Sequence, residues 1–91
     1  MYDLPASATL FEPLDLPNGQ VIPNRIAKAA MEENMADHDH LPGAALLELY
    51  RRWGAGGAGM LLTGNVMVAD DAVTGPGGVV LDARQPLDPF R

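Results

Sequence analysis

The stretch LPGAALLELYRRWGAGGAGMLLTGNVMV, residues 41–68, decides the fold because it carries three consecutive structural signals. Pro42 suits the opening of a helix, and apolar residues follow it at spacings of three and four. The glycines within 54–57 offer the left-handed conformation that ends a helix. Residues 58–68 are apolar almost throughout, which is typical of a strand covered on both faces. We therefore expect a helix, a glycine turn and a buried strand.

The residues before this stretch predict a hairpin, a short apolar segment and a loop. Residues 10–24 place apolar side chains on both sides of Pro17-Asn18-Gly19, and Asn-Gly readily accepts the positive φ angles of a tight hairpin turn. By periodicity, residues 25–31, RIAKAAM, fit either a buried strand or a helical turn. Residues 32–43 are polar and end in Pro-Gly, which indicates a loop.

The residues after it predict a loop over 69–78, rich in glycine, and a short strand over 79–81. A strand, a loop, a helix, a glycine turn and a second strand in this order form a right-handed β–α–β crossover. This crossover is the unit of parallel α/β folds, and we expect that class here.

Composition and charge restrict the classes of partner. The chain has 91 residues, of which 47% are hydrophobic and 20% charged, the balance of a globular protein with one core. Its formal net charge of -6 argues against nucleic acid or an anionic membrane surface as a partner. The sequence contains no cysteine, which excludes disulfides, thiolate metal sites and cysteine nucleophiles. With no targeting segment or membrane span visible, we expect a cytoplasmic protein that acts on a small molecule.

Several groups of residues follow one another in a distinctive order. They are Leu10-Phe11 with Pro13-Leu14, then Asn24-Arg25-Ile26, Ala29-Ala30-Met31, and Tyr50-Arg51-Arg52-Trp53 followed by Gly56-Gly57-Ala58-Gly59. Taken together, in this order and spacing, they resemble the start of the old yellow enzyme family of NADH:flavin oxidoreductases. The resemblance covers most of the chain, from about Leu10 onward. It implies a (β/α)8 TIM barrel whose N-terminal hairpin closes the bottom.

This resemblance implies that residues 1–91 are the N-terminal portion of a single FMN-binding TIM-barrel domain, with the hairpin at 10–24 and the first barrel units at 25–91. A full barrel takes about 250 residues, roughly 30 for each strand–helix unit, so about two units are present. Such a fragment leaves apolar strand faces that the rest of the barrel, or a second copy in a homo-oligomer, would cover. We expect the chain alone to be inactive.

Barrel enzymes place their sites after the carboxyl ends of the strands, here at residues 29–32 and 63–65. The resemblance implies that FMN lies against five cofactor-binding residues, Ala29, Ala30, Met31, Glu32 and Asn65. Ala30 stands where many relatives have proline, and Asn65 where many have alanine. An asparagine there either donates a hydrogen bond to a flavin carbonyl or caps a strand end.

Glu32 stands where the family has a threonine or cysteine that tunes the reduction potential of the flavin. A carboxylate beside a reduced, anionic flavin opposes reduction, so Glu32 either lowers the potential or points into solvent. Replacing Glu32 with Thr in a complete enzyme should therefore raise the potential. An unchanged potential would indicate that Glu32 lies in solvent.

The family's reaction passes hydride from NADH or NADPH to FMN and then to the β-carbon of an electron-poor alkene. The residues that hold the alkene and donate the proton lie further along the family's chain, so no catalytic residue is assigned to residues 1–91. The alternative is a self-sufficient small α/β binding or assembly module without catalysis. A cooperative thermal transition of the isolated chain would favour that module.

Other motifs carry no site. His38 and His40 alternate with aspartates, but neighbours on an extended chain point to opposite sides, so we expect a solvated loop rather than a metal site. Residues 54–59 lack the Lys and Ser/Thr of a P-loop and follow a helix instead of opening one. Met31, Met60 and Met67 are expected to fill the core.

Overall fold

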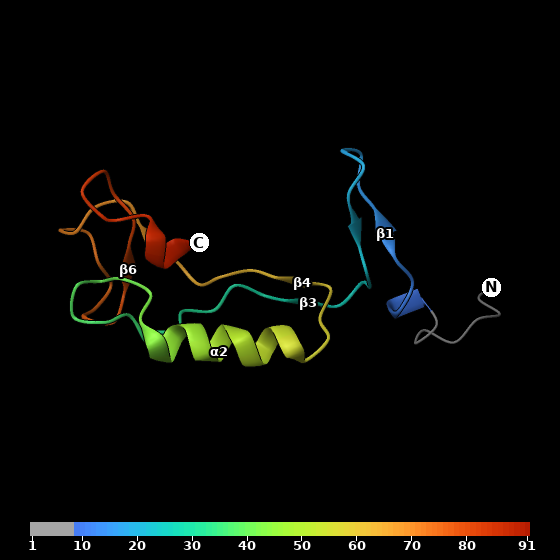
Figure 1. Cartoon of the computed structure of the whole chain (residues 1–91), viewed down its shortest axis with the longest axis horizontal. Coiled ribbons are helices and arrows are strands. Elements are labelled where there is room, and N and C mark those ends of the chain that lie inside the picture. The colour runs from blue at the N-terminus through green and yellow to red at the C-terminus, as the bar shows by residue number, and fades with distance from the viewer. Residues whose placement is uncertain (1–8) are drawn as a thin grey trace.

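The computed structural model describes residues 9–91, and a strand–helix–strand unit forms its centre (Figure 1). β3 (Ala27–Lys28) pairs in parallel with β4 (Met60–Leu61). α2 (Ala44–Ala55) connects the two strands and lies along one face of the pair. Parallel strands need a crossover of this kind because a tight turn cannot join them. The predicted helix is present, and a strand is the correct interpretation of the segment at 25–31.

The ends of α2 follow from the glycines around it. Gly43 is the N-terminal cap, so the helix begins two residues later than Pro42. At the other end, the N–H of Gly56 donates to the carbonyl of Trp53, and Gly57 has a φ angle of 96°. This left-handed conformation turns the chain toward β4 and is costly for any residue with a Cβ atom. The predicted glycine turn is therefore confirmed.

An antiparallel hairpin precedes the unit. β1 (Leu14–Asp15) pairs with β2 (Val21–Ile22), and the N–H of Leu16 donates to the carbonyl of Gln20 across a three-residue turn. Within this turn Gly19 has a φ angle of 88°, whereas Asn18 keeps a negative φ and accepts a hydrogen bond from the N–H of Gln20. The turn is thus of the three-residue kind that ends in a left-handed glycine, rather than a two-residue Asn-Gly turn.

A second parallel pair lies at the other end of the molecule. β5 (Val66–Met67) pairs with β6 (Val79–Val80), and the chain ends in the 3-10 helix η1 (Asp88–Phe90). The prediction of a single buried strand over 58–68 is wrong. Residues 62–65 have no strand geometry and divide this segment into β4 and β5. Within residues 9–91, no helix combines the length and apolarity required to cross a bilayer.

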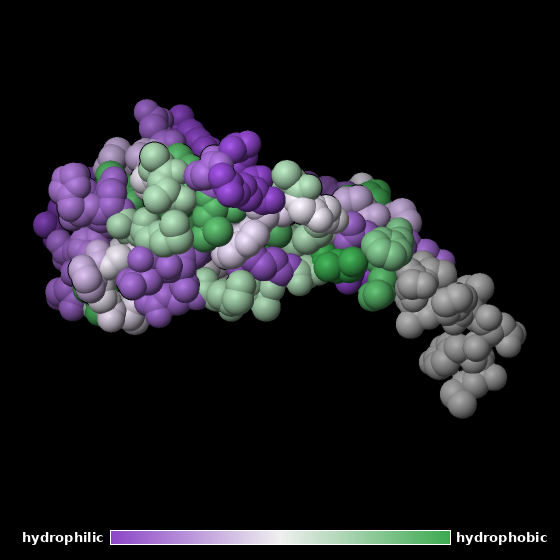
Figure 2. Space-filling model, turned by 90° about the horizontal axis from the view of Figure 1, so that it is seen from below, coloured by the Kyte–Doolittle hydropathy of each residue, from purple (hydrophilic) through white to green (hydrophobic). Residues whose placement is uncertain are grey.

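Few side chains are buried in this arrangement. Among residues 9–91, the buried hydrophobic residues are Leu46, Val79 and Val80. The radius of gyration is 16.7 Å, against about 12 Å for a compact domain of this length. Figure 2 shows hydrophobic residues at the surface among hydrophilic ones on the side of the molecule seen from below. Residues 9–91 therefore form an elongated structure in which no continuous core is seen.

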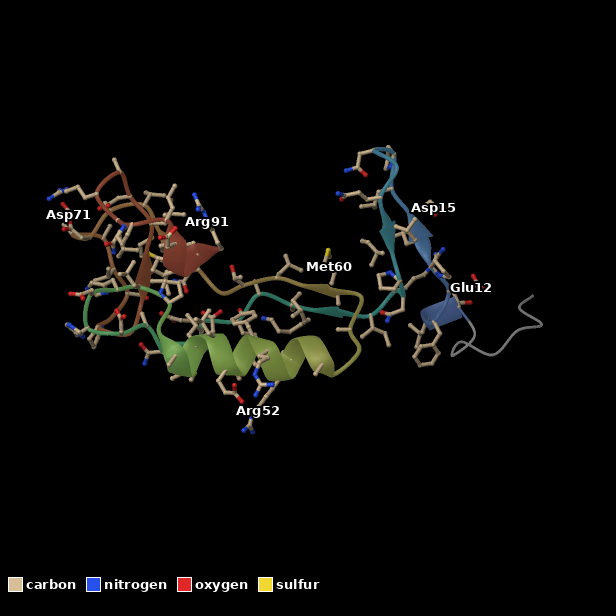
Figure 3. All side chains as sticks on the ribbon, in the orientation of Figure 1. Glu12, Asp15, Arg52, Met60, Asp71 and Arg91 are labelled. Atoms are coloured by element: carbon tan, nitrogen blue, oxygen red, sulfur yellow. The ribbon has the colours of Figure 1, made fainter. Side chains whose placement is uncertain are left out.

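The face of the β3–β4 pair opposite α2 is uncovered. Met60 is 43% exposed and points away from α2 (Figure 3), and Leu62 on the same strand continuation is 44% exposed. Met31, beyond β3, is 50% exposed. The expectations that β4 is covered on both faces and that Met31 and Met60 fill the core are wrong. These side chains are exposed because α2 covers one face of the β3–β4 pair and no described segment packs on the other face.

Candidate functional site

The segments that follow β3 and β4 meet beyond the carboxyl ends of the two strands. Gly64 is buried there, and a Cβ atom at this position would lie 2.2 Å from the carbonyl oxygen of Met31. Real side chains do not approach a backbone oxygen so closely, so only glycine permits this contact. We call the contact between Met31 and Gly64 the strand-end junction. It holds together the two segments in which the sequence predicts a site.

The predicted cofactor-binding residues lie around the strand-end junction. Each of the five is solvent-exposed, and they are Ala29, Ala30, Met31, Glu32 and Asn65. Met31 forms one half of the junction, and Asn65 directly follows the other half. The exposed alanines and methionine provide an apolar surface, and Asn65 adds an amide that can donate or accept a hydrogen bond. These groups fit one side of a planar, mostly apolar ring with polar edges, such as a flavin.

Glu32 contacts a third segment. Its Oε1 accepts a hydrogen bond from the hydroxyl of Thr74, in the loop between β5 and β6. That loop also approaches residue 34, where a Cβ atom on Gly77 would lie 2.6 Å from the Asn34 carbonyl oxygen. Asn34 itself has a positive φ angle of 54°. The loop after β5 therefore packs on the loop after β3, and Glu32 is restrained at its surface by Thr74.

Glu33, which was not predicted from the sequence, has the more extensive contacts of the two adjacent glutamates. Its Oε2 accepts hydrogen bonds from the hydroxyl of Tyr50 on α2 and, at 2.9 Å, from the N–H of Gly64. A signal was present, because Tyr50 lies on the apolar face of the predicted helix and a tyrosine packed there needs a partner for its hydroxyl. Sequence alone did not identify that partner.

The protonation of this pair follows from its surroundings. Burial alone raises the pKa of Glu33, but the hydrogen bonds from Tyr50 and Gly64 and the charge of Lys28 outweigh it and leave the pKa lowered. Burial, followed by the hydrogen bond and charge of Glu33, raises the pKa of Tyr50 to about 12. At neutral pH, Glu33 is therefore an ionised acceptor and Tyr50 a protonated donor.

Lys28 contacts the aromatic side chains of α2, and its charge acts on Glu33 in the polar cluster formed by Glu33, Tyr50 and Gly64. Its Nζ lies 4.8 Å from the ring centroid of Trp53 and 5.7 Å from that of Tyr50, and it donates to the Ala29 carbonyl at 2.6 Å. The two rings are packed edge to face, with centroids 5.2 Å apart. Such contacts suit a lysine whose stem is covered by apolar groups. Lys28 thus points toward α2, away from the uncovered face of the strands.

A pocket of about 200 Å³ lies next to this cluster. Apolar side chains from α2, β5, β6 and η1 line it together with Glu33 and Tyr50. This apolar lining explains why burial acts on the pKa values of both groups.

The two histidines are in different environments. His38 is exposed, with Nε2 3.3 Å from Oδ2 of Asp39. His40 is half-buried, has a positive φ angle of 60°, and donates from Nδ1 to the carbonyl of Gly78 at 2.8 Å. Its own carbonyl accepts from the N–H of Val80, so the loop is packed on β6 rather than fully solvated. Among residues 9–91, no group of three or more His, Asp or Glu side chains could hold a metal ion.

A parallel strand–helix–strand unit, such as β3, α2 and β4 form here, is the building unit of α/β proteins. Comparison of the sequence with known proteins shows a more specific similarity. NADH-dependent flavin oxidoreductase iliE of Hypocrea jecorina is 38% identical over 72 residues, which cover 79% of this chain and 18% of that protein. The protein of the same name from Neonectria sp. is 47% identical over 57 residues, 63% of this chain and 7% of that protein.

A further relative is NADH-dependent flavin oxidoreductase nadA of Aspergillus parasiticus, 37% identical over 62 residues, 60% of this chain and 14% of that protein. No protein-family model matches the chain. Over most of its length, the chain is therefore similar to NADH-dependent flavin oxidoreductases. It spans less than a fifth of the length of the curated relatives it matches.

Proposed function

We propose that the chain forms the first part of a (β/α)8 barrel in an FMN-dependent oxidoreductase of the old yellow enzyme type. The complete enzyme would pass hydride from NADH or NADPH through FMN to an electron-poor alkene. The observation that carries this proposal is the strand-end junction, with exposed apolar residues and Asn65 beside it. Ligands of barrel enzymes bind at this end of the strands, and the relatives' names specify a flavin.

In this proposal the residues of the chain bind and orient the flavin, and the flavin itself supplies the hydride chemistry. Ala29, Ala30 and Met31 would lie against the ring system, and Asn65 would donate to one of its carbonyl oxygens. The uncovered face of β3 and β4 would pack inside the rest of the barrel, which would also supply the groups that hold the alkene and donate a proton.

A chimera tests this proposal. In the Hypocrea jecorina relative, the 72 aligned residues are replaced by the matching residues of this chain. A contiguous match of 72 out of 91 residues leaves at most 19 unmatched at either end, so it contains residues 20–72 and the whole strand-end junction.

We expect the chimera to oxidise NADH in the presence of an electron-poor alkene, whereas the 91-residue chain shows neither this activity nor the visible absorbance of bound flavin. Alkene-dependent consumption of NADH is the measurement, and the parent relative is the control. A chain that by itself holds stoichiometric FMN and reduces the alkene would show that no further part of a barrel is needed.

The position of Glu32 leads to a second prediction. Replacing Glu32 with Thr in the chimera should raise the midpoint potential of the flavin, because it removes a carboxylate that opposes the anionic reduced form. Glu32→Gln is the companion variant, since it removes the negative charge but keeps the shape of the side chain, and residue 32 lies within the part of this chain that the chimera contains. Spectroelectrochemical titration measures the potential. If Glu32→Thr leaves the potential unchanged, Glu32 lies in solvent and has no part in the flavin site.

A further inference from the structure

The carboxylate of Glu33 connects three separate segments of the chain. Glu33 follows β3, Tyr50 lies in the middle of α2, and Gly64 follows β4. The same oxygen, Oε2, accepts from the Tyr50 hydroxyl and from the Gly64 N–H. The side chain therefore ties both segments of the strand-end junction to the helix that packs on them.

The absence of a side chain at Gly64 makes this connection geometrically feasible. A Cβ atom at that position would lie 2.5 Å from Oε1 of Glu33 as well as 2.2 Å from the Met31 carbonyl. The carboxylate thus fills the space that a side chain at residue 64 would occupy, and it pairs with the backbone N–H of the same residue. A buried N–H without a partner would be unfavourable, so Glu33 also satisfies this group.

From these contacts we infer that Glu33 is a positioning residue for the flavin site, an inference that rests on the proposed function. Glu33 does not touch the flavin in this account. Its carboxylate fixes the spacing between the segments after β3 and β4, and thereby holds Met31 and Asn65 where the ring would lie. Glu32, its neighbour in the sequence, is exposed and makes its side-chain hydrogen bond to a different loop.

The charge of Glu33 is part of this role, because an ionised acceptor forms stronger hydrogen bonds than a neutral one. The groups around it are the Tyr50 hydroxyl from α2, the Lys28 ammonium from β3 and the Gly64 N–H, and Arg91 at the end of the chain lines the same pocket. Glu33→Gln keeps the shape of the side chain but removes the charge. It should weaken both hydrogen bonds and loosen the strand-end junction.

The first test measures FMN affinity of the chimera. We expect Glu33→Gln to weaken FMN binding about tenfold, the size of effect that loss of one charged hydrogen bond has on an equilibrium. Tyr50→Phe, which leaves the carboxylate and its bond to Gly64 in place, should have a smaller effect in the same direction. Glu48→Gln is the matched control, because the carboxylate of Glu48 is on the same helix as Tyr50 but pairs with Arg51 and Arg52 on its exposed side.

The second test measures the ionisation of Tyr50. This ionisation depends on the contact between the Tyr50 hydroxyl and the Glu33 carboxylate, which does not involve the flavin. Subtracting the tyrosinate titration of the Tyr50→Phe chimera from that of the chimera isolates this group, whose pKa is raised to about 12. Folding therefore gains stability from neutral Tyr50 below about pH 10, and this gain is lost as the pH rises through about 12. Glu33→Gln should shift the titration to lower pH, because the negative charge that opposes ionisation is removed and the hydrogen bond that Tyr50 donates becomes weaker.

The outcomes separate the inference from the function on which it rests. Weaker FMN binding together with a lowered Tyr50 titration supports Glu33 as the positioning residue. Unchanged FMN affinity in Glu33→Gln overturns it, even if the chimera itself binds flavin. A chimera that binds no FMN while its parent does overturns the proposed function, and the positioning role with it.

Discussion

Replacing Gly64 with valine in the chimera should abolish tight FMN binding, with affinity falling by at least about tenfold. A Cβ atom at residue 64 would lie 2.2 Å from the Met31 carbonyl oxygen and 2.5 Å from Oε1 of Glu33. Neither the backbone of Met31 nor the hydrogen-bonded carboxylate can remain in place, so the two segments must move apart. Overpacking of this kind typically costs about 1–3 kcal/mol and displaces the backbone.

A second glycine provides the matched control for that substitution. Gly54 lies inside α2 and has nothing within 4 Å of the position that a Cβ atom would occupy. Gly54→Ala should stabilise the protein by about 0.5–1 kcal/mol, because alanine loses less conformational entropy in a helix. FMN affinity, measured by equilibrium titration, should be unchanged in this variant. Tight FMN binding by Gly64→Val would show that the strand-end junction does not position the flavin.

The isolated 91-residue chain should show no cooperative thermal transition. Its described residues bury Leu46, Val79 and Val80, while large apolar side chains such as Phe11 and Val68 are 65% and 83% exposed. So little buried apolar surface cannot offset the conformational entropy of ordering the chain. We expect a broad, featureless melt by circular dichroism and strong binding of a hydrophobic dye, as in other states that lack fixed packing.

The chimera provides the comparison for this experiment. It should melt cooperatively and bind little dye, because the rest of the barrel would cover β3 and β4 and pair their edges. A sharp, reversible transition of the isolated chain in a monodisperse sample would contradict this expectation. It would favour the alternative function, a self-sufficient binding or assembly module.

Local chemistry explains which parts of the fold were predictable from the sequence. The apolar spacing around Leu46 and Tyr50 located α2, and Gly57 ended it because a left-handed residue is needed there. The turn at Gly19 followed from the same preference. These features depend on a few neighbouring residues, so the sequence pattern contains the necessary information.

The parts that were missed depend on contacts between distant segments. The run at 58–68 looks like one buried strand, yet Gly64 meets Met31 and the strand pairing stops on either side of it. The link between Glu33 and Tyr50 joins residues 17 positions apart through side chains, and no periodicity reports such a contact. The burial of β4, Met31 and Met60 was overestimated. Apolar composition identifies a strand face that must pack against another element, but it does not show whether that element is part of this chain.

We have proposed that the segments after β3 and β4 form one side of an FMN site. The most direct measurement is the FMN content of the purified chimera, determined from its visible absorbance after heat release and compared with that of the parent relative. We expect about one FMN per polypeptide, as for any enzyme with a single flavin site. A soluble, cooperatively folded chimera that contains no flavin, beside a parent that is fully loaded, would contradict it.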